Sequence, residues 1–319
     1  MATRYFQWDH PDAPVLDGTA GSFMALMKAL LVGTAGVAYG SGADEKLAAG
    51  WTLEWEDTGA HKIVMRSPPA LGGSGCYLRI VDNNATYALV ECFESMSDID
   101  TGSAGTGQVR VQKSSDASST TRPWGIIADG RTCYGTVLGG ATSVGPPSTP
   151  YYDYSRLFGF GDYEPFIPGD PGIFAAGRGV SDGGPWTDTG WLARSIRPTN
   201  INSSDSIFFS TRTNSLSPTA TKLGIAGDGD RAFGADNSWI EGVSEGLSGG
   251  YQWTVAPVAS TGCVRGMMRG MYVPLNRIST THRIIGDTAT PAAVLSPPTL
   301  HVLGFGYVLS FVGFSGGVW

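Results

Sequence analysis

Four acidic side chains lie in one aromatic stretch of the chain and are the residues best suited by type and spacing to catalysis. The stretch is residues 151–174, YYDYSRLFGFGDYEPFIPGDPGIF, and it holds Asp153, Asp162, Glu164 and Asp170. Two carboxylates beside aromatic rings are the groups with which glycoside hydrolases cleave sugar chains. Aromatic residues also lie near Asp wherever an irregular loop packs on a β-core. A carboxylate-based polysaccharide depolymerase is therefore kept as an alternative function, and we expect no catalytic residues.

Metal and nucleotide sites are not indicated by the spacing of the remaining polar residues. Asp228, Asp230 and Asp236 place carboxylates on one predicted loop, but the twelve-residue spacing ending in Glu that defines a calcium loop is missing. The four histidines are scattered, and no phosphate-binding G-x-x-x-x-G-K-S/T occurs. We expect neither a metal ion nor a cofactor.

Four cysteines are spread widely along the chain, at Cys76, Cys92, Cys133 and Cys263. They have no C-x-x-C spacing, so a structural zinc site is not expected. Two disulfides are allowed by the even number, but a chain of this length does not need them to fold. We expect free thiols that are mostly buried, because a free cysteine behaves as a small hydrophobic residue.

Four tryptophans stand outside every convincing core strand and are the candidate interface residues: Trp186, Trp191, Trp239 and Trp319. Loops rich in aromatic residues and poor in charge have the composition of protein–protein interfaces. Trp and Tyr dominate binding energy where they fill a pocket of the partner. We expect at least one of the four to anchor a partner protein.

The overall composition excludes some classes of partner. Charged residues make up 15% of the 319 residues, against a usual share of about 25%. The net charge is −7 and no Lys/Arg cluster occurs, which argues against a nucleic-acid-binding face. Low charge with 46 glycines is common in secreted β-proteins and in subunits of larger assemblies. The N-terminal residues lack the apolar core of a signal peptide, so we expect synthesis in the cytoplasm and no membrane insertion.

One helix is expected, at residues 22–32, SFMALMKALLV. Its apolar residues recur at i, i+3, i+4, i+7 and i+8, which places them on one stripe. Ser22 is the expected N-cap, and Gly33 the residue that ends the helix in a left-handed conformation. A helix this short needs a surface to pack on, and it is too short to span a bilayer.

Strands account for most of the remaining pattern. An extended arm or edge strand is expected at 5–16, one helical turn at 44–49, and a turn at 82–84. Asp129-Gly130 indicates a hairpin. The polar stretch 95–107 is expected to interrupt a meander. The expected strands of this half are 51–55, 61–66, 76–81, 85–93, 109–112, 124–128 and 132–138.

The chain divides into two parts by composition. Residues 1–138 are predicted to form a helix plus β-meander domain, 139–150 a linker or long loop, and 151–319 a loop-rich β domain. In the second domain the aromatic block shows little periodicity, and the expected strands are 207–211, 253–258, 270–274, 299–303 and 307–311. The predicted fold is mainly β, with antiparallel sheets arranged as a barrel or sandwich, one short amphipathic helix and long irregular loops.

With these residues in view, the chain resembles an uncharacterised family of structural proteins from tailed bacteriophages and prophages. The resemblance covers about two thirds of the sequence and leaves 175–250 out. It lies in APVLDGTAGS (13–22) with AAGWT (48–52), in GCYLR (75–79), ESMSD (94–98), RPW (122–124) and FGD (160–162), and in RGMYVP (269–274) with Trp319.

The resemblance implies a non-enzymatic virion component, associated with the tail, baseplate or distal end, and supplies no catalytic residues. Its implied partners are other virion proteins and symmetry-related copies of itself, and it would be made in the host cytoplasm. Three alternatives stay open: an adhesin at the tail tip that binds host-surface glycan, a capsid decoration protein, and the depolymerase named above.

Overall fold

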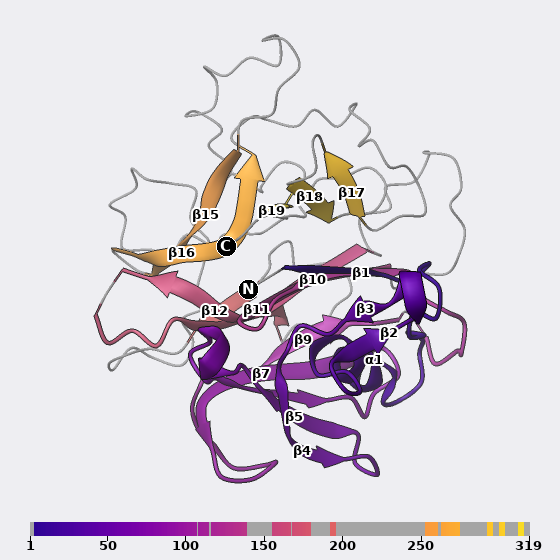
Figure 1. Ribbon diagram of the computed structural model, residues 1–319. Helices are drawn as coiled ribbons and strands as arrows, with labels where there is room; N and C mark the ends of the chain where they lie inside the picture. Colours follow the sequence, from indigo (N-terminus) through magenta and orange to yellow (C-terminus); the bar gives the residue numbers. More distant parts are fainter. Residues whose placement is uncertain are drawn as a thin grey trace.

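The computed structural model describes residues 3–138 and 155–179, apart from 107, 115 and 167, and six strands between 192 and 315. The fold is mainly β, with antiparallel strands and one α-helix in the described residues (Figure 1). This confirms the predicted fold class. In the same residues no helix has the length and apolar character needed to cross a bilayer. The four candidate tryptophans, the 139–150 linker and the 207–211 and 307–311 strands all lie outside the described residues.

A meander forms the first sheet, in the spatial order β4, β5, β6, β7, β9, with β8 also paired to β7. Side chains alternate between its two faces, and Leu78 and Ile80 are among those that face the core. The strands are β4 (Thr52–Asp57), β5 (Lys62–Arg66), β6 (Tyr77–Val81), β7 (Tyr87–Met96), β8 (Gly102–Gly105) and β9 (Val109–Gln112).

The interruption predicted at 95–107 was wrong, because β7 runs on to Met96 and β8 pairs with it. The Phe93 ring explains why small residues form this strand. A Cβ atom added to Gly102 would come within 2.5 Å of that ring, and one added to Gly105 within 2.8 Å. Glycine here makes room for an aromatic side chain, whereas the sequence pattern alone resembles a loop.

A second sheet crosses the middle of the molecule in the order β1, β10, β11, β12, β13, β14. The edge strand predicted in the N-terminal arm is present as β1, and the Asp129-Gly130 hairpin joins β10 to β11. The strands are β1 (Arg4–Gln7), β10 (Trp124–Ala128), β11 (Thr132–Leu138), β12 (Ser155–Pro165), β13 (Ile173–Gly179) and β14 (Leu192–Ser195). Strands β11 and β12, on either side of the predicted linker, are direct neighbours.

The aromatic block is more regular than the sequence pattern suggested, since most of it forms β12 and the start of β13. In β12 aromatic residues alternate with glycines, whereas the usual alternation in a strand is between apolar and polar residues. Phe158 and Phe160 are buried, and a Cβ on the intervening Gly159 would come within 2.8 Å of the Tyr134 ring. Alternation of this kind is hard to recognise by hydropathy.

A third sheet contains the C-terminal strands and shares β12 with the second. Residues 163–165 of β12 pair with β16, while residues 155–161 pair with β11. Three of the predicted C-terminal strands are present as β15, β16 and β18, whereas β17 and β19 were not predicted. The strands are β15 (Trp253–Ser260), β16 (Cys263–Pro274), β17 (Ala292–Leu295), β18 (Leu300–Leu303) and β19 (Val312–Ser315).

Helix α1 (Ser22–Leu31) has the predicted buried stripe but a different N-cap. Gly21 is the N-cap, and the Ser22 hydroxyl donates to the carbonyl of Asp17 instead. Gly33 adopts the predicted left-handed conformation, with φ 70°. The last helical carbonyls are satisfied from outside, because the N–H of Ala49 donates to Leu30 and that of Trp51 to Leu31.

The helical turn predicted at 44–49 was wrong, because the N–H groups at its end bond to other segments. A short 3-10 helix, η1 (Gly42–Asp44), instead connects β2 (Val37–Tyr39) to β3 (Lys46–Leu47), and the two strands form a small hairpin. The N–H groups of residues 48–51 bond to Gly36 and to the end of α1, so they are not available to a helix of their own. A second 3-10 turn, η2 (Pro69–Leu71), follows β5.

The N-terminus of α1 is capped by a buried ion pair from the meander. Asp82, in the β6–β7 turn, accepts hydrogen bonds through Oδ2 from the N–H groups of Phe23 (2.8 Å) and Met24 (3.1 Å). Its Oδ1 lies 2.5 Å from Nζ of Lys113, and both side chains are fully buried. Lys113 also donates to the carbonyl of Thr19. A carboxylate at a helix N-terminus complements the helix dipole, so the pair fixes α1 against the sheet.

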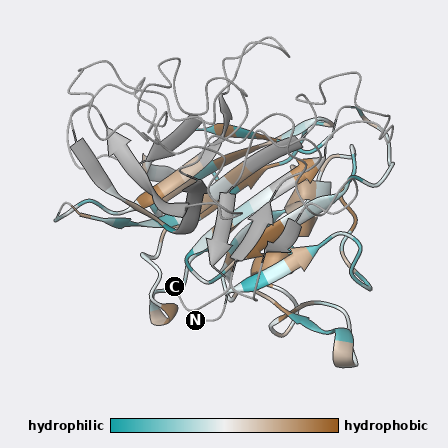
Figure 2. Ribbon diagram, turned by 90° about the horizontal axis from the view of Figure 1, so that it is seen from above, coloured by the Kyte–Doolittle hydropathy of each residue, from teal (hydrophilic) through white to brown (hydrophobic). Residues whose placement is uncertain are grey.

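The main core lies between the meander and the second sheet, with α1 packed into it. Figure 1 places β10 to β12 between the meander and the C-terminal strands, and in Figure 2 hydrophobic residues gather on the central strands while the peripheral loops are hydrophilic. Ring contacts join the layers: Phe23 of α1 meets Phe158 of β12, and Trp51 meets Phe160. Cys76, Cys92 and Cys133 are free and buried, as predicted, and the side chain of Cys263 is not described.

Removing the cation of the buried pair should destabilise the fold strongly. We expect Lys113→Met to lower the free energy of unfolding by about 3–5 kcal/mol, because Asp82 is left charged and buried without its partner. Urea unfolding followed by circular dichroism measures this change. The control is Lys28→Met, which removes the partly exposed Lys28–Glu56 pair and should cost less than about 1 kcal/mol. Equal losses from the two variants would contradict this account of α1.

The N-terminal arm should respond to pH through His10, whose Nδ1 lies 2.8 Å from the Tyr39 hydroxyl. Burial, and then the nearby Lys46, lower the pKa of His10 below its ordinary value of 6.5, although Asp9 acts the other way. A folded-state pKa below the unfolded one means that stability present above pH 6.5 is lost as the pH falls through the lowered value. We expect the melting temperature to fall from neutral pH to about pH 5, and to fall less in His10→Gln. Identical pH profiles for the two proteins would exclude His10 as the cause.

Candidate functional site

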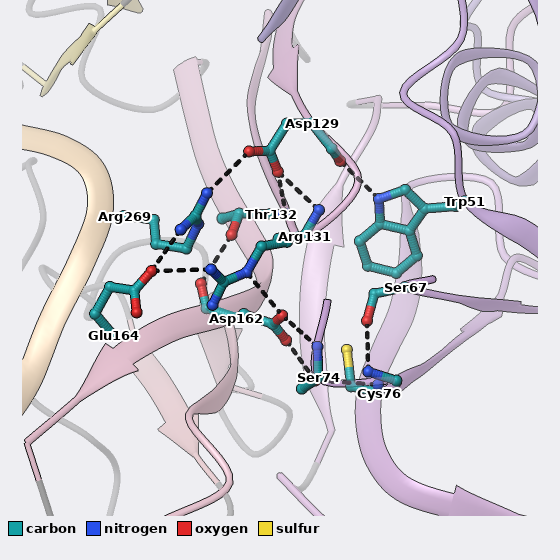
Figure 3. A network of polar contacts seen from close by, with 11 residues as sticks. Trp51, Ser67, Ser74, Cys76, Asp129, Arg131, Thr132, Asp162, Glu164 and Arg269 are labelled. Atoms are coloured by element: carbon teal, nitrogen blue, oxygen red, sulfur yellow. Dashed lines mark hydrogen bonds and ion pairs between the residues drawn. The ribbon is translucent and has the colours of Figure 1, made fainter. Parts of the chain in front are cut away.

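Six polar residues from four separate segments meet where the second and third sheets join (Figure 3). We call them the polar junction. They come from the loop before β6, the β10–β11 hairpin, β12 and β16, and are Ser74, Asp129, Arg131, Asp162, Glu164 and Arg269.

Asp162 is the buried centre of the polar junction and is only 1% exposed. It accepts hydrogen bonds from the N–H (2.8 Å) and the hydroxyl (2.6 Å) of Ser74, and Arg131 Nε lies 3.4 Å away. Burial raises the pKa of Asp162, while the Ser74 bonds and Arg131 act in the opposite direction. The backbone is tied down as well, because the Thr132 hydroxyl donates to the Asp162 carbonyl.

Asp129 holds the hairpin and reaches the third sheet. Its Oδ1 accepts from the N–H groups of Arg131 and Thr132, the arrangement that an Asp at a tight turn favours. Its Oδ2 lies 3.2 Å from Nη2 of Arg269, and its carbonyl accepts from Trp51 Nε1 at 2.8 Å. One aspartate thus connects the hairpin, Trp51 directly before β4, and strand β16.

Glu164 closes the network from its more exposed side. It accepts from Nη1 of Arg269 and forms an ion pair of 3.1 Å with Nη1 of Arg131. For Arg269, burial lowers the pKa, but Glu164 and Asp129 more than offset it, so the pKa stands above its ordinary value. Each guanidinium group lies between two carboxylates: Arg131 between Asp162 and Glu164, and Arg269 between Asp129 and Glu164.

The geometry of the polar junction suits it to hold the joined segments together. Three carboxylates and two guanidinium groups bond to one another and to the backbone, and a catalytic acid must instead reach the substrate. Asp162 and Glu164 are brought together through Arg131, as the hypothesis of a carboxylate pair requires, but Asp162 is covered. Asp170 lies elsewhere, with its carboxylate accepting from the Tyr163 hydroxyl and the Gly172 N–H. Asp153 lies outside the described residues.

Sequence reasoning found the acidic members of this network in β12 but missed Ser74, Arg131 and Arg269. Asp162 and Glu164 are two apart on a strand, so they share a face, which period-two analysis could have indicated. The two arginines are far from β12 in sequence: Arg131 is placed by the register of β11 with β12, and Arg269 by that of β12 with β16. The candidate loop around Asp228 lies outside the described residues, and among those described no cluster of three or more His, Cys, Asp and Glu side chains could hold a metal ion.

Neither a scan against protein-family models nor a search of curated proteins found a match to this chain. The polar junction must therefore be interpreted from its own geometry.

The two carboxylates of β12 should differ in their contribution to stability. We expect Asp162→Asn to cost about 2–3 kcal/mol, because the isosteric amide leaves one buried donor without an acceptor. Glu164→Gln, at a side chain that is 48% exposed, should change stability by less than about 1 kcal/mol. Chemical unfolding of the two variants beside the unchanged protein measures both. A larger loss in Glu164→Gln would show that the junction is held from its exposed side.

Proposed function

We propose that this chain is a non-enzymatic structural subunit of a tailed-phage virion, part of the tail or its distal end, which acts by assembling in several copies. The proposal starts from the resemblance in sequence. Contacts within the fold support it, because the segments that carry the resemblance touch one another although they are far apart in the chain. The observation that carries most weight is that the segments similar to the phage family contact one another in the fold.

Three contacts illustrate the convergence. The N–H of Arg122 donates to the carbonyl of Leu16 at 2.7 Å, and Nε1 of Trp124 donates to Pro14 at 3.1 Å. Trp51 packs edge-on against Phe160, with ring centroids 6.5 Å apart. These pairs join the 13–22 segment to RPW, and AAGWT to FGD. Residues that a family shares for the sake of its architecture are expected to contact one another in this way.

The hydrogen bonds of the buried acidic residues also favour a structural role over the depolymerase. Asp162 and Asp170 are buried, and their carboxylates accept hydrogen bonds from within the chain. Carboxylates held in this way stabilise the joint between sheets. In an assembly subunit such joints matter, because many weak contacts repeated by symmetry require each copy to keep one shape.

Locating the chain in purified particles tests the proposal. We expect gold-labelled antibody, or density from electron cryo-microscopy, to place several copies in a ring at the tail or its tip. Particles treated with pre-immune antibody are the control. Absence from the particle, or labelling confined to the capsid shell, would overturn the tail assignment.

A further inference from the structure

The N-terminal arm, residues 4–10, is held by contacts with two other parts of the chain. Among the described strands β1 pairs with β10 alone, at the edge of the second sheet (Figure 1). Phe6 is fully buried, and its ring centroid lies 6.0 Å from that of Tyr39. The Tyr39 hydroxyl is 2.8 Å from Nδ1 of His10 and accepts from the N–H of Gln7 at 3.4 Å. We call β10 and Tyr39 the arm site, and neither belongs to the arm.

The chain that follows the arm is anchored separately. The carbonyl of Pro14 accepts from Nε1 of Trp124 at 3.1 Å, and that of Leu16 accepts from the N–H of Arg122 at 2.7 Å. The Leu16 side chain is fully buried. Helix α1 is in turn capped by Asp82. The contacts that hold the chain at residues 14–16 are therefore made without any residue of the arm.

One turn, His10-Pro11-Asp12-Ala13, lies between the two anchored parts. The N–H of Ala13 donates to the carbonyl of His10 at 3.1 Å, which closes a β-turn. Asp12, at the third position, has φ 59°, in the left-handed region that favours glycine at this place in a turn. Pro11 and Asp12 are exposed, so little packing opposes a change in the turn. An extended chain would release the strain at Asp12, and the two prolines at 11 and 14 favour extended backbone.

A strand that is docked at an edge and joined by a strained surface turn suits exchange between copies of a protein. The arm makes the same contacts in its own arm site and in that of a second copy, so the turn and the protein concentration decide between the two. A short linker gives the arm an effective concentration of about millimolar at its own site. Exchange is therefore favoured in an assembly, where copies are crowded, and in concentrated solution.

We propose that the arm of one copy occupies the arm site of a neighbouring copy, with the His10–Ala13 turn opened as the hinge. This inference rests on the proposed assembly in several copies, and it names the contact through which the copies join. The four hinge residues span about 14 Å when extended, at about 3.5 Å per residue, so the arm reaches a copy packed directly beside its own. Donation in one direction, repeated around an axis, closes into a ring.

A disulfide between β1 and β10 reports where the arm lies. Arg4 and Ala128 are register partners, so cysteines at these positions can be joined when the arm is docked. Chains carrying Arg4→Cys and chains carrying Ala128→Cys, both with Cys263→Ser, are mixed at about 1 mM and oxidised with glutathione disulfide. We expect mass spectrometry to find a link between residue 4 of one chain and residue 128 of another. The Arg4→Cys chain mixed with chains that keep Ala128 is the control and should give no such link.

The hinge is tested at Asp12, which is exposed. Asp12→Gly removes the strain of the closed turn and should lower the yield of the link between chains by about threefold to tenfold. Asp12→Val should raise the yield by a similar factor, because a β-branched residue avoids the left-handed region. The matched control is Asp12→Asn, which removes the charge but tolerates the same backbone, and should change the yield by less than about twofold. Circular dichroism confirms that each variant is folded.

A chain that carries both Arg4→Cys and Ala128→Cys shows the opposite outcome directly. Links within single chains, with none between chains in the mixture, would overturn the exchange and leave the location of the protein in the particle as a separate question. Oligomers that lack the link between residues 4 and 128 would also overturn it, since the copies would then join through another surface. Equal yields from Asp12→Gly and Asp12→Val would exclude the turn as the hinge and overturn the proposal as stated.

Discussion

The buried pair of Asp82 and Lys113 is the interaction on which the first half of the structure depends. Every polar group of Asp82 is used: its N–H donates to His61, its carbonyl accepts from Gly21, and its carboxylate bonds to Lys113 and to two N–H groups of α1. An isolated helix of ten residues would be unstable in water. The pair supplies the missing cap and fixes the direction in which α1 leaves the sheet. The apolar stripe then packs in one way only.

The second half depends on strands that belong to two sheets at once. Strand β12 pairs with β11 and β13 up to Asp162 and with β16 beyond it, and β13 ends against β9 of the meander. The change of partner in β12 occurs beside Gly161, which has φ 115° and lies so close to Arg131 that a Cβ atom there would be 2.2 Å from its carbonyl. The polar junction surrounds this bend. Its ion pairs hold three segments at the point where the ladder of backbone hydrogen bonds changes partner.

Local patterns predicted those parts of the fold that depend on near neighbours. The 3.6-residue stripe of α1, the left-handed Gly33, the hairpin at Asp129-Gly130 and the strands of the meander were all recognisable, because period and turn chemistry are short-range properties. The N-cap was missed because its acceptor lies about sixty residues away, in a turn where Asp82 resembles an ordinary turn former. Strand β12 was missed because its alternation uses glycine under aromatic rings. The junction was missed because the pairing of Arg131 and Arg269 with β12 is set by register between distant strands.

The charged residues of this chain divide according to what they bond to, and that division shapes its possible functions. With charge at 15% of residues, few ionisable groups are available for solubility alone. Lys113, Arg131 and Arg269 each join segments that are distant in sequence, so their charges act within the fold. Among the described residues, Arg110 on β9 has a contact of a different kind, the ring of Tyr87. Charges that join distant segments keep the helix and the sheets in one arrangement, and a single arrangement is what the proposed assembly would require of each copy.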